Sequence, residues 1–179
     1  MTKTATIKST ATTTCYCYIE SPLGQIFVQG NGEFVTGLYM PRHKWWPGPD
    51  PAWRQSDASF AMVREQLAEY FAGDRRDFVL PLDFQLAHGF RRDVLSHLVL
   101  IDYGHTETYS QVAASTGHPR AVRAVGSACA TNPMPVIVPC HRVLRSDGKL
   151  GGYVGGPQTK ATLLSLEGRG RIDTDPLSR

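Results

Sequence analysis

The strongest constraint on the fold lies in the second half of the chain, where the sequence predicts two short helices separated by a tight break. Thr108 and Gln111 have the spacing of a capping box, in which a hydroxyl and an amide three residues apart satisfy the first free N–H groups of a helix. A helix is therefore predicted from Tyr109 up to the break at Gly117-His118-Pro119. Proline suits the first turn of a helix, so the next one is predicted over 120–131. Such a pair indicates a helix-turn-helix unit.

The second of these helices is poor in large side chains. Its small residues are Ala121, Ala124, Gly126, Ser127, Ala128 and Ala130. A helix of this kind can approach another surface closely, and two interpretations stay open. One is close packing against a neighbouring helix. The other is a helix that lies in a nucleic-acid groove, which Arg120 and Arg123, about one turn apart, favour.

The first half of the chain predicts a small sheet covered by one helix. Alternating, β-rich segments predict strands over 15–20, 25–29 and 34–40, and a further strand is predicted around 78–80. Apolar residues at helical spacing predict a helix from Asp57 to Gly73. After it, the next helix has Phe90, Val94, Leu95, Leu98 and Val99 on one face. The expected fold class is α/β (α+β), with a mostly helical second part.

The composition is ordinary for a globular protein, with 179 residues of which 41% are hydrophobic and 20% charged. No run of about 18 apolar residues occurs, so no membrane span is predicted. The Thr- and Ala-rich start is typical of a flexible tail rather than a signal peptide. The spacing of the four cysteines fits neither paired CxxC zinc motifs nor a secreted disulfide framework, so a reducing, cytoplasmic compartment is expected.

Charge is distributed unevenly between the two halves. Residues 1–84 carry a net charge of −1 and residues 85–179 a net charge of +4, which together give the +3 of the whole chain. The second half is therefore the better candidate for binding a polyanion, although a net charge of this size is weak support by itself.

Pro139-Cys140-His141 is the most reactive pattern in the chain, because it places a cysteine directly before a histidine. A thiolate is the nucleophilic form of cysteine, and a neighbouring imidazole is the usual means of producing one. The proline fixes φ and removes a donor, so Cys140 is predicted in a turn or at a strand edge. In an extended segment the two side chains would point to opposite faces, so proton transfer would need a local bend or one bridging water.

Several motifs occur in one order along the chain: Tyr109, Arg123-Ala124-Val125-Gly126, Asn132-Pro133, the segment 135–143, Gly152-Tyr153 with Gly155-Gly156, and Glu167-Gly168. In this order, and above all in its Pro-Cys-His-Arg-Val core, the chain resembles the O6-alkylguanine-DNA alkyltransferases. The resemblance is strong over about 88–168 and weak in the first half. It implies a ribonuclease H-like N-terminal domain over 15–85 and a winged-helix-like, DNA-binding C-terminal domain over 86–170. Flexible tails are implied at 1–14 and 171–179.

The resemblance implies direct, irreversible transfer of an alkyl group from guanine O6 to a cysteine, with O4-alkylthymine a minor substrate. The protein would be consumed, with no cofactor and no metal. Its implied partner is double-stranded DNA that contains O6-alkylguanine; a monomer is implied, and cooperative binding stays open. By position, Cys140 is the acceptor, His141 the base acting through water, and Glu167 the group that orients His141. Asn132 would tie the helix-turn-helix to the active-site turn.

The same resemblance assigns DNA contacts and a substrate pocket. Arg123 would replace the extruded base, and Tyr109 would press on the adjacent phosphate and donate to a guanine ring nitrogen. The implied DNA-binding residues are Tyr109, Arg120, Arg123, Ala124, Gly126 and Ser127. The implied pocket residues are Cys129, Pro135, Val143, Tyr153, Val154, Gly155 and Lys160. There the Val154 N–H would face O6, the Cys140 and Val143 carbonyls would accept from the exocyclic amine, and Lys160 would steady the loop or the thiolate.

Departures from the family pattern bear more on packing than on chemistry. Val154, Leu95 and Asp102 replace a common serine, tryptophan and proline, and Asn31 stands where the human member has a zinc-ligating cysteine. Three other functions are disfavoured. A lesion-binding protein without transfer is disfavoured because such proteins carry tryptophan at the position of Cys140. A helix-turn-helix regulator lacks an effector domain, and a turnover hydrolase is disfavoured by the adjacent Cys-His pair.

Overall fold

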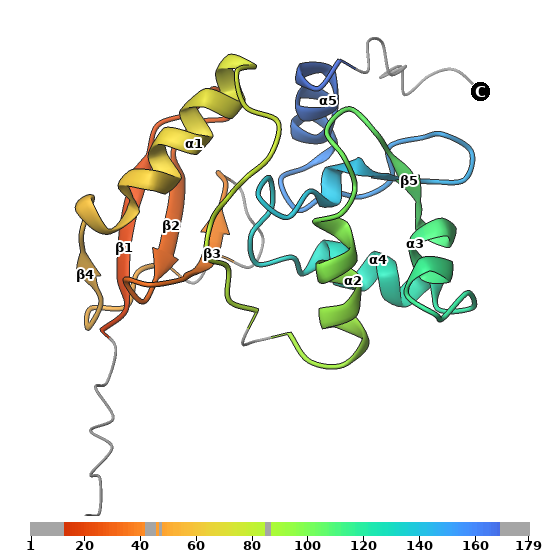
Figure 1. The fold of residues 1–179 in the computed structure, drawn as a ribbon, viewed down its shortest axis with the longest axis horizontal. Helices are drawn as coiled ribbons and strands as arrows, with labels where there is room; N and C mark the ends of the chain where they lie inside the picture. Colours follow the sequence, from red (N-terminus) through yellow and green to blue (C-terminus); the bar gives the residue numbers. More distant parts are fainter. Residues whose placement is uncertain (1–12, 42–45, 47, 85–86, 169–179) are drawn as a thin grey trace, which may run out of the picture.

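The computed structural model describes residues 13–41, 46, 48–84 and 87–168. The two expected tails lie outside these residues, apart from positions 13 and 14. Figure 1 shows a sheet with one helix across it on one side of the molecule and a group of helices and loops on the other. The mixed α/β class expected from the sequence is confirmed.

The N-terminal sheet has four strands in the order β3-β2-β1-β4. They are β1 (Cys15–Ile19), β2 (Ile26–Gly30), β3 (Val35–Tyr39) and β4 (Arg54–Gln55). β1 to β3 form an antiparallel meander, and β4, which was not predicted, pairs parallel to β1. Alternate residues of β1, including Cys15 and Cys17, are buried, as the alternating sequence predicts.

The strand predicted around 78–80 is wrong. This segment is irregular, and the chain touches the sheet only at an isolated bridge between Leu82 and Val35. The amide of Val35 donates to Pro81 O at 2.8 Å, and the amide of Asp83 donates to Val35 O at 3.0 Å. Apolar side chains at 78–80 thus suggested a strand, but the backbone pairs with the sheet only at Leu82, outside the predicted segment.

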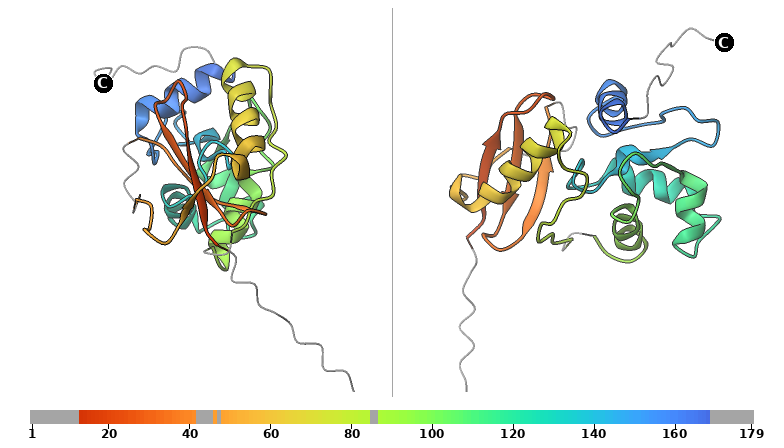
Figure 2. Two further views of the ribbon diagram at one scale, coloured as in Figure 1. Left: turned by 90° about the vertical axis from the view of Figure 1, so that its left-hand side faces the viewer. Right: turned by 45° about the horizontal axis from the view of Figure 1, so that its top comes forward.

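Helix α1 (Ala61–Ala72) lies across one face of the sheet, as Figure 2 shows from the side. Asp57 precedes a short 3-10 turn (Ala58–Phe60) rather than the α-helix itself, so α1 begins later than predicted. Its buried positions include Val63, Leu67 and Tyr70. Gly73 ends the helix in the left-handed conformation, at φ 85°, which glycine adopts without steric cost.

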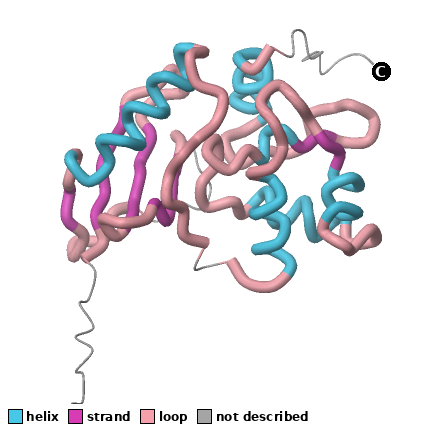
Figure 3. The backbone as a smooth tube through the Cα atoms, in the orientation of Figure 1, coloured by secondary structure: helices cyan, strands magenta, loops and turns pink. Residues whose placement is uncertain are grey.

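The C-terminal half contains α2 (Phe90–Leu98), α3 (Tyr109–Ser115), α4 (Val122–Ala130) and α5 (Pro157–Leu166). The strands β5 (Glu107–Thr108) and β6 (Val143–Leu144) pair in parallel. Figure 3 shows how much of this half is loop. The capping box is confirmed: Thr108 Oγ1 accepts from the Gln111 amide, and Gln111 Oε1 accepts from the Thr108 amide.

The predicted start of the helix at position 120 is wrong. A turn closed by the Ala121 amide donating to His118 O, at 2.8 Å, occupies the residues after Pro119. The first α-helical residue is consequently Val122, and Arg120 lies in the turn rather than on α4. The two arginines are therefore not held on one helix face.

The two halves share a continuous hydrophobic core that includes residues from both. The edge strand β3 faces the C-terminal half, and the amide of Leu38 donates to Pro133 O at 2.8 Å. No helix among the described residues has the length and apolar character needed to cross a membrane.

Candidate active site

Cys140 follows a buried apolar segment that is held in an unusual conformation. Residues 134–139 are all buried, and Val136 has a φ of 77°, a region that β-branched residues rarely adopt. Such strain, of the order of 1–3 kcal/mol, persists only where surrounding packing imposes it, and it clusters at functional sites. Cys140 then begins a 3-10 turn (Cys140–Arg142), which confirms the predicted turn and rules out an extended strand at this point.

The thiol of Cys140 is buried, with 2% exposure, and is held by the side chain of Asn132. Asn132 Nδ2 donates to Cys140 Sγ at 3.1 Å and to Val138 O at 2.8 Å. Its Oδ1 accepts from the amide of Met134 at 3.0 Å. One side chain at the end of α4 thus fixes the sulfur and the loop before it, which is the connection that the resemblance implied.

Burial raises the pKa of the Cys140 thiol to about 11. The hydrogen bond from Asn132 and the charge of Lys160 oppose this, because both favour the thiolate. Cys140 is therefore a protonated thiol, not a preformed thiolate, and its ionisation needs a base nearby.

His141 and Glu167 form a buried pair next to the thiol. His141 Nε2 lies 2.9 Å from Glu167 Oε1, and both side chains are fully buried. Burial lowers the pKa of His141, with the charges of Arg142 and Lys160 acting in the same direction and Glu167 acting against them. His141 Nδ1 is buried and has no hydrogen-bond partner among the described residues, so the neutral imidazole has a nitrogen that could accept a proton.

Two residues that sequence reasoning missed complete the surroundings of Glu167. Arg142 binds the carboxylate with two nitrogens, Nη2 to Oε1 at 2.9 Å and Nε to Oε2 at 3.0 Å. Tyr70 of α1 donates its hydroxyl to Oε1 at 2.7 Å. Burial would raise the pKa of Glu167, but hydrogen bonds and charges from His141 and Arg142 hold it at about 2. Arg142 could have been identified from the sequence, because it directly follows Cys140-His141. Tyr70 could not, because its sequence pattern indicates only a core position on its helix.

Lys160, in α5, follows the glycine-rich loop (148–156) and is fully buried. Its Nζ donates to Val143 O at 2.6 Å, to Leu150 O at 2.5 Å and to Gly152 O at 3.4 Å. Burial lowers its pKa to about 8, against the effect of Cys140. The lysine thus holds the loop and also faces the thiol. The Val143 carbonyl, expected to accept from a guanine amine, already accepts from Lys160.

A cavity of about 610 Å³ opens beside these groups. Its lining residues are Tyr109, Gly126, Cys129, Ala130, Arg145, Gly151, Gly152, Tyr153 and Val154. Five of the residues implied by the resemblance are among them. Pro135, Val143 and Lys160 are not, because they are buried, and the half-buried Gly155 is not among the lining residues either. Arg145 was missed; its side chain is exposed and pairs with Asp147 at 3.2 Å.

The exposed face of α4 carries Val122 and Arg123 in its first turn and small residues after them. Arg123, Ala124 and Ser127 are exposed, whereas Val125 and Ala128 are buried against the rest of the domain. Gly126 lies between the two faces and reaches the cavity. The small residues are therefore consistent with both interpretations, close helix packing and binding in a nucleic-acid groove. One face of α4 packs closely, and the other is exposed beside the cavity.

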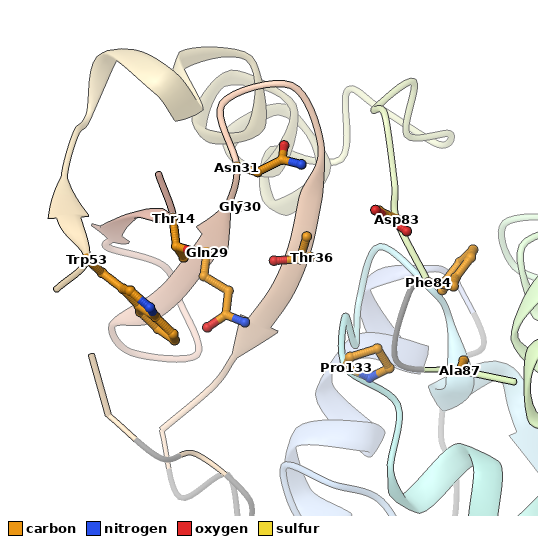
Figure 4. Close-up of a pocket in the computed structure, with 10 residues that line it drawn as sticks. All are labelled: Thr14, Gln29, Gly30, Asn31, Thr36, Trp53, Asp83, Phe84, Ala87 and Pro133. Atoms are coloured by element: carbon orange, nitrogen blue, oxygen red, sulfur yellow. The ribbon is translucent and has the colours of Figure 1, made fainter. Parts of the chain in front are cut away.

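A second cavity, of about 370 Å³, lies where the two halves meet (Figure 4). Gln29 and Thr36 of the sheet lie on one side of it, and Asp83 and Phe84 lie on the other. Asn31, at its rim, accepts from the amides of Glu33 and Phe34 at 3.0 and 2.7 Å and so stabilises a turn. Within the described part of the chain, no group of three His, Cys, Asp or Glu side chains could hold a metal ion.

Comparison with known protein families matches both halves of the chain. Residues 14–84 match the 6-O-methylguanine DNA methyltransferase, ribonuclease-like domain, and residues 89–169 match the 6-O-methylguanine DNA methyltransferase, DNA binding domain. A methylated-DNA–protein-cysteine methyltransferase of Mycolicibacterium paratuberculosis is 40% identical over 86% of this chain and 92% of its own length. A constitutive one of Bacillus subtilis is 36% identical over 85% and 94%.

Solved structures give the same result. A crystal structure of Mycobacterium tuberculosis OGT in complex with DNA has a TM-score of 0.80 and 38% identity, and the match covers 86% of this chain and 92% of that one. Both domain models and relatives at this level of identity span nearly the whole described fold. The resemblance carried by the Pro-Cys-His-Arg-Val core is thereby confirmed, and the chain belongs to the 6-O-methylguanine DNA methyltransferase family.

Proposed function

We propose that this protein is a methylated-DNA–protein-cysteine methyltransferase that repairs O6-alkylguanine by moving the alkyl group onto Cys140. The observation that carries the proposal is a buried thiol held by Asn132 next to the His141–Glu167 pair. The relatives' names and their DNA complex support the reaction class.

In the transfer, a carbon–sulfur bond forms at Cys140 while the bond between that carbon and guanine O6 breaks. The thiol proton passes to Nδ1 of His141 through one bridging water, which the buried, unpartnered nitrogen favours. Glu167 stabilises the imidazolium that results. Negative charge develops on the guanine, where the N–H of Val154 and the hydroxyl of Tyr109 stabilise it. Both residues line the cavity.

The reaction occurs once per molecule. A thioether is a stable product, because water does not displace a thiolate from an alkyl carbon under ordinary conditions. The protein is therefore consumed in proportion to the lesions that it repairs. Because the acceptor must stay a free thiol, the reducing cytoplasm is the proposed setting.

The target nucleotide must leave the duplex before sulfur can reach it, at a cost of a few kcal/mol. We infer that α4 lies in the minor groove, that Arg123 fills the place of the extruded base, and that Tyr109 promotes the rotation. Readout in that groove is nearly degenerate, so recognition depends on the lesion rather than on the sequence around it. O4-alkylthymine, which presents a similar alkylated oxygen, is a secondary substrate.

The test is to incubate the protein with O6-methylguanine duplex DNA and to measure intact and peptide masses. One methyl group per molecule, located on Cys140, is the expected result. Cys140→Ala should bind the DNA and remain unmodified, while Cys17→Ala, which removes a buried thiol from the sheet, should still accept the group. Repair by the Cys140→Ala variant would refute the proposal. Unmodified wild-type protein on DNA would indicate a lesion sensor, and repeated turnover a hydrolase.

A further inference from the structure

We propose that Tyr70, in the N-terminal half, is a positioning residue for the His141–Glu167 pair, so that this half takes a direct part in alkyl transfer. The inference rests on the proposed function. It assigns a chemical role to the N-terminal half, for which no catalytic residue was predicted from the sequence.

The hydroxyl of Tyr70 and the imidazole of His141 contact the same oxygen atom of Glu167. It donates to Glu167 Oε1 at 2.7 Å, and the same atom lies 2.9 Å from His141 Nε2. Tyr70 is completely buried, and burial together with the Glu167 charge raises its pKa far above the ordinary value. The hydroxyl therefore keeps its proton and acts as a permanent donor.

The ring of Tyr70 cannot readily turn away from this contact. It packs against Phe71, Phe78 and Tyr103, with ring centroids 5.4, 5.3 and 6.1 Å away. Figures 1 and 2 show the C-terminal end of α1 beside α5, whose end carries Glu167. Aromatic packing on one side and the carboxylate on the other fix the direction of the hydroxyl.

The electrostatic effect of this donor has a definite sign. A hydrogen bond to Oε1 draws negative charge away from the atom that would stabilise a protonated imidazole. The hydroxyl consequently favours neutral His141, the form that can accept the thiol proton. Arg142 and Lys160 act in the same direction, whereas Glu167 acts against it. Among the described residues, Tyr153 is a further titratable neighbour, with its ring centroid 6.4 Å from that of His141, and Cys140 precedes His141 directly in the chain.

Removal of the hydroxyl would not leave the carboxylate unsatisfied. Oε1 would still contact His141 and Arg142, and Oε2 accepts from the Gly104 amide at 3.1 Å as well as from Arg142. Tyr70→Phe is thus a change of charge distribution more than of structure. This makes its effect on the pH dependence measurable.

The N-terminal half also reaches two other parts of the site. The amide of Leu38 donates to Pro133 O, next to Asn132, and Met40 Cε lies 2.7 Å from where a Cβ on Gly155 would be. With Tyr70, three contacts from one half reach the segment after Asn132, the glycine-rich loop and the Glu167 carboxylate. Tyr70 differs from the other two because it touches an ionisable group of the transfer machinery.

The experiment is the single-turnover rate of methyl transfer from O6-methylguanine duplex DNA as a function of pH. For wild type, the rate should rise with pH as His141 loses its proton. In Tyr70→Phe that rise should move to higher pH, so that transfer is about three- to tenfold slower on the acid side. The two rates should converge toward alkaline pH, where the imidazole is neutral in both proteins.

Tyr103→Phe is the matched control. The Tyr103 hydroxyl donates to Leu166 O at 3.1 Å, one residue before Glu167, without contacting the carboxylate. This variant loses a comparable hydrogen bond at the same helix end and should keep the wild-type pH dependence. Thermal unfolding of all three proteins checks that each is folded.

A uniform slowing of Tyr70→Phe at every pH, or no change, would overturn the positioning role while leaving methylated Cys140 in place. An equal displacement in Tyr103→Phe would also overturn it, since a general loosening of the helix end would then be the cause. If Tyr70→Phe is unfolded, 3-fluorotyrosine at position 70 replaces it. This stronger donor should move the rise to lower pH, and a curve at or above the wild-type position would reject the proposal.

Discussion

At the scale of single residues, the site depends on side chains that each hold two or more groups at once. Asn132 holds the sulfur, a carbonyl and an amide, and Lys160 holds one carbonyl of β6 and two of the glycine-rich loop. Buried polar networks of this kind stabilise one geometry, because an unmet group inside a protein costs about 1–3 kcal/mol. The thiol therefore has few alternative positions.

Asn132→Ala tests this arrangement. It removes a donor to the forming thiolate, and hydrogen bonds to charged groups contribute about 1.5–3 kcal/mol, so methyl transfer should slow about ten- to hundredfold. Stability should also fall, by about 1–3 kcal/mol, because Val138 O and the Met134 amide lose their partner. Single-turnover rates and urea unfolding measure the two effects.

Asn31→Ala serves as the control for this change. Asn31 also caps a turn with its side chain, but it lies in the N-terminal half, away from the sulfur. It should lose some stability and keep the transfer rate. If Asn132→Ala reacted with iodoacetamide as fast as wild type at every pH, its influence on the thiol would be disproved.

At the scale of elements, α4 combines a buried face with an exposed one in a single short helix. Val125 and Ala128 anchor it, while Arg123 and Ser127 remain exposed beside the cavity. Arg120 is set apart from this face because the turn after His118 delays the helix. The two arginines are therefore expected to act differently on DNA, although the sequence places them close together.

Arg123→Ala should slow transfer from duplex DNA by about ten- to hundredfold, because the extruded base has no replacement in the stack. Transfer from single-stranded DNA, which needs no extrusion, should change little. Arg120→Ala should weaken binding to both and reduce the salt dependence of duplex binding by about one unit of slope. Rates on the two DNA forms and binding at several salt concentrations check this. Equal duplex rates for the two variants would contradict the assignment.

At the scale of the whole molecule, the two halves are joined through the site itself. Met40 of the N-terminal half packs against Gly155 of the glycine-rich loop, and Leu38 pairs with Pro133. The loop over the cavity is therefore held from the opposite half as well as by Lys160.

A double-mutant cycle measures this junction. Gly155→Ala places a methyl group 2.7 Å from Met40 Cε, the end of a flexible side chain that can shift, and should cost about 1 kcal/mol through overpacking. Met40→Ala should cost about 2–5 kcal/mol, since Met40 is buried. Combined, the two should cost less than the sum of their separate effects, because the space left by Met40 accepts the new methyl group. Urea unfolding gives the energies, and strict additivity would show that the halves do not meet here.

Local patterns predicted much of this fold, for a physical reason that individual residues show. The capping box at Thr108, the glycine end of α1 at Gly73 and the alternation of Cys15 and Cys17 depend on hydrogen bonds or side-chain directions within a few residues. Where the pairing partner of a strand is distant in the sequence, the prediction from local patterns was wrong or was not made. It placed a strand around 78–80 that finds no pairing partner, and it omitted β4, which forms only because β1 lies beside it.

The sequence alone determined the reactive pair, because Cys140 and His141 are adjacent and their flanking motif identifies the family. Only the tertiary structure decided what surrounds them. Tyr70 and Glu167 are 97 positions apart, and nothing in either local sequence specifies that a hydroxyl and a carboxylate should meet. That contact exists because the two halves bury their apolar faces against each other. This packing brings together polar side chains that are far apart in the sequence.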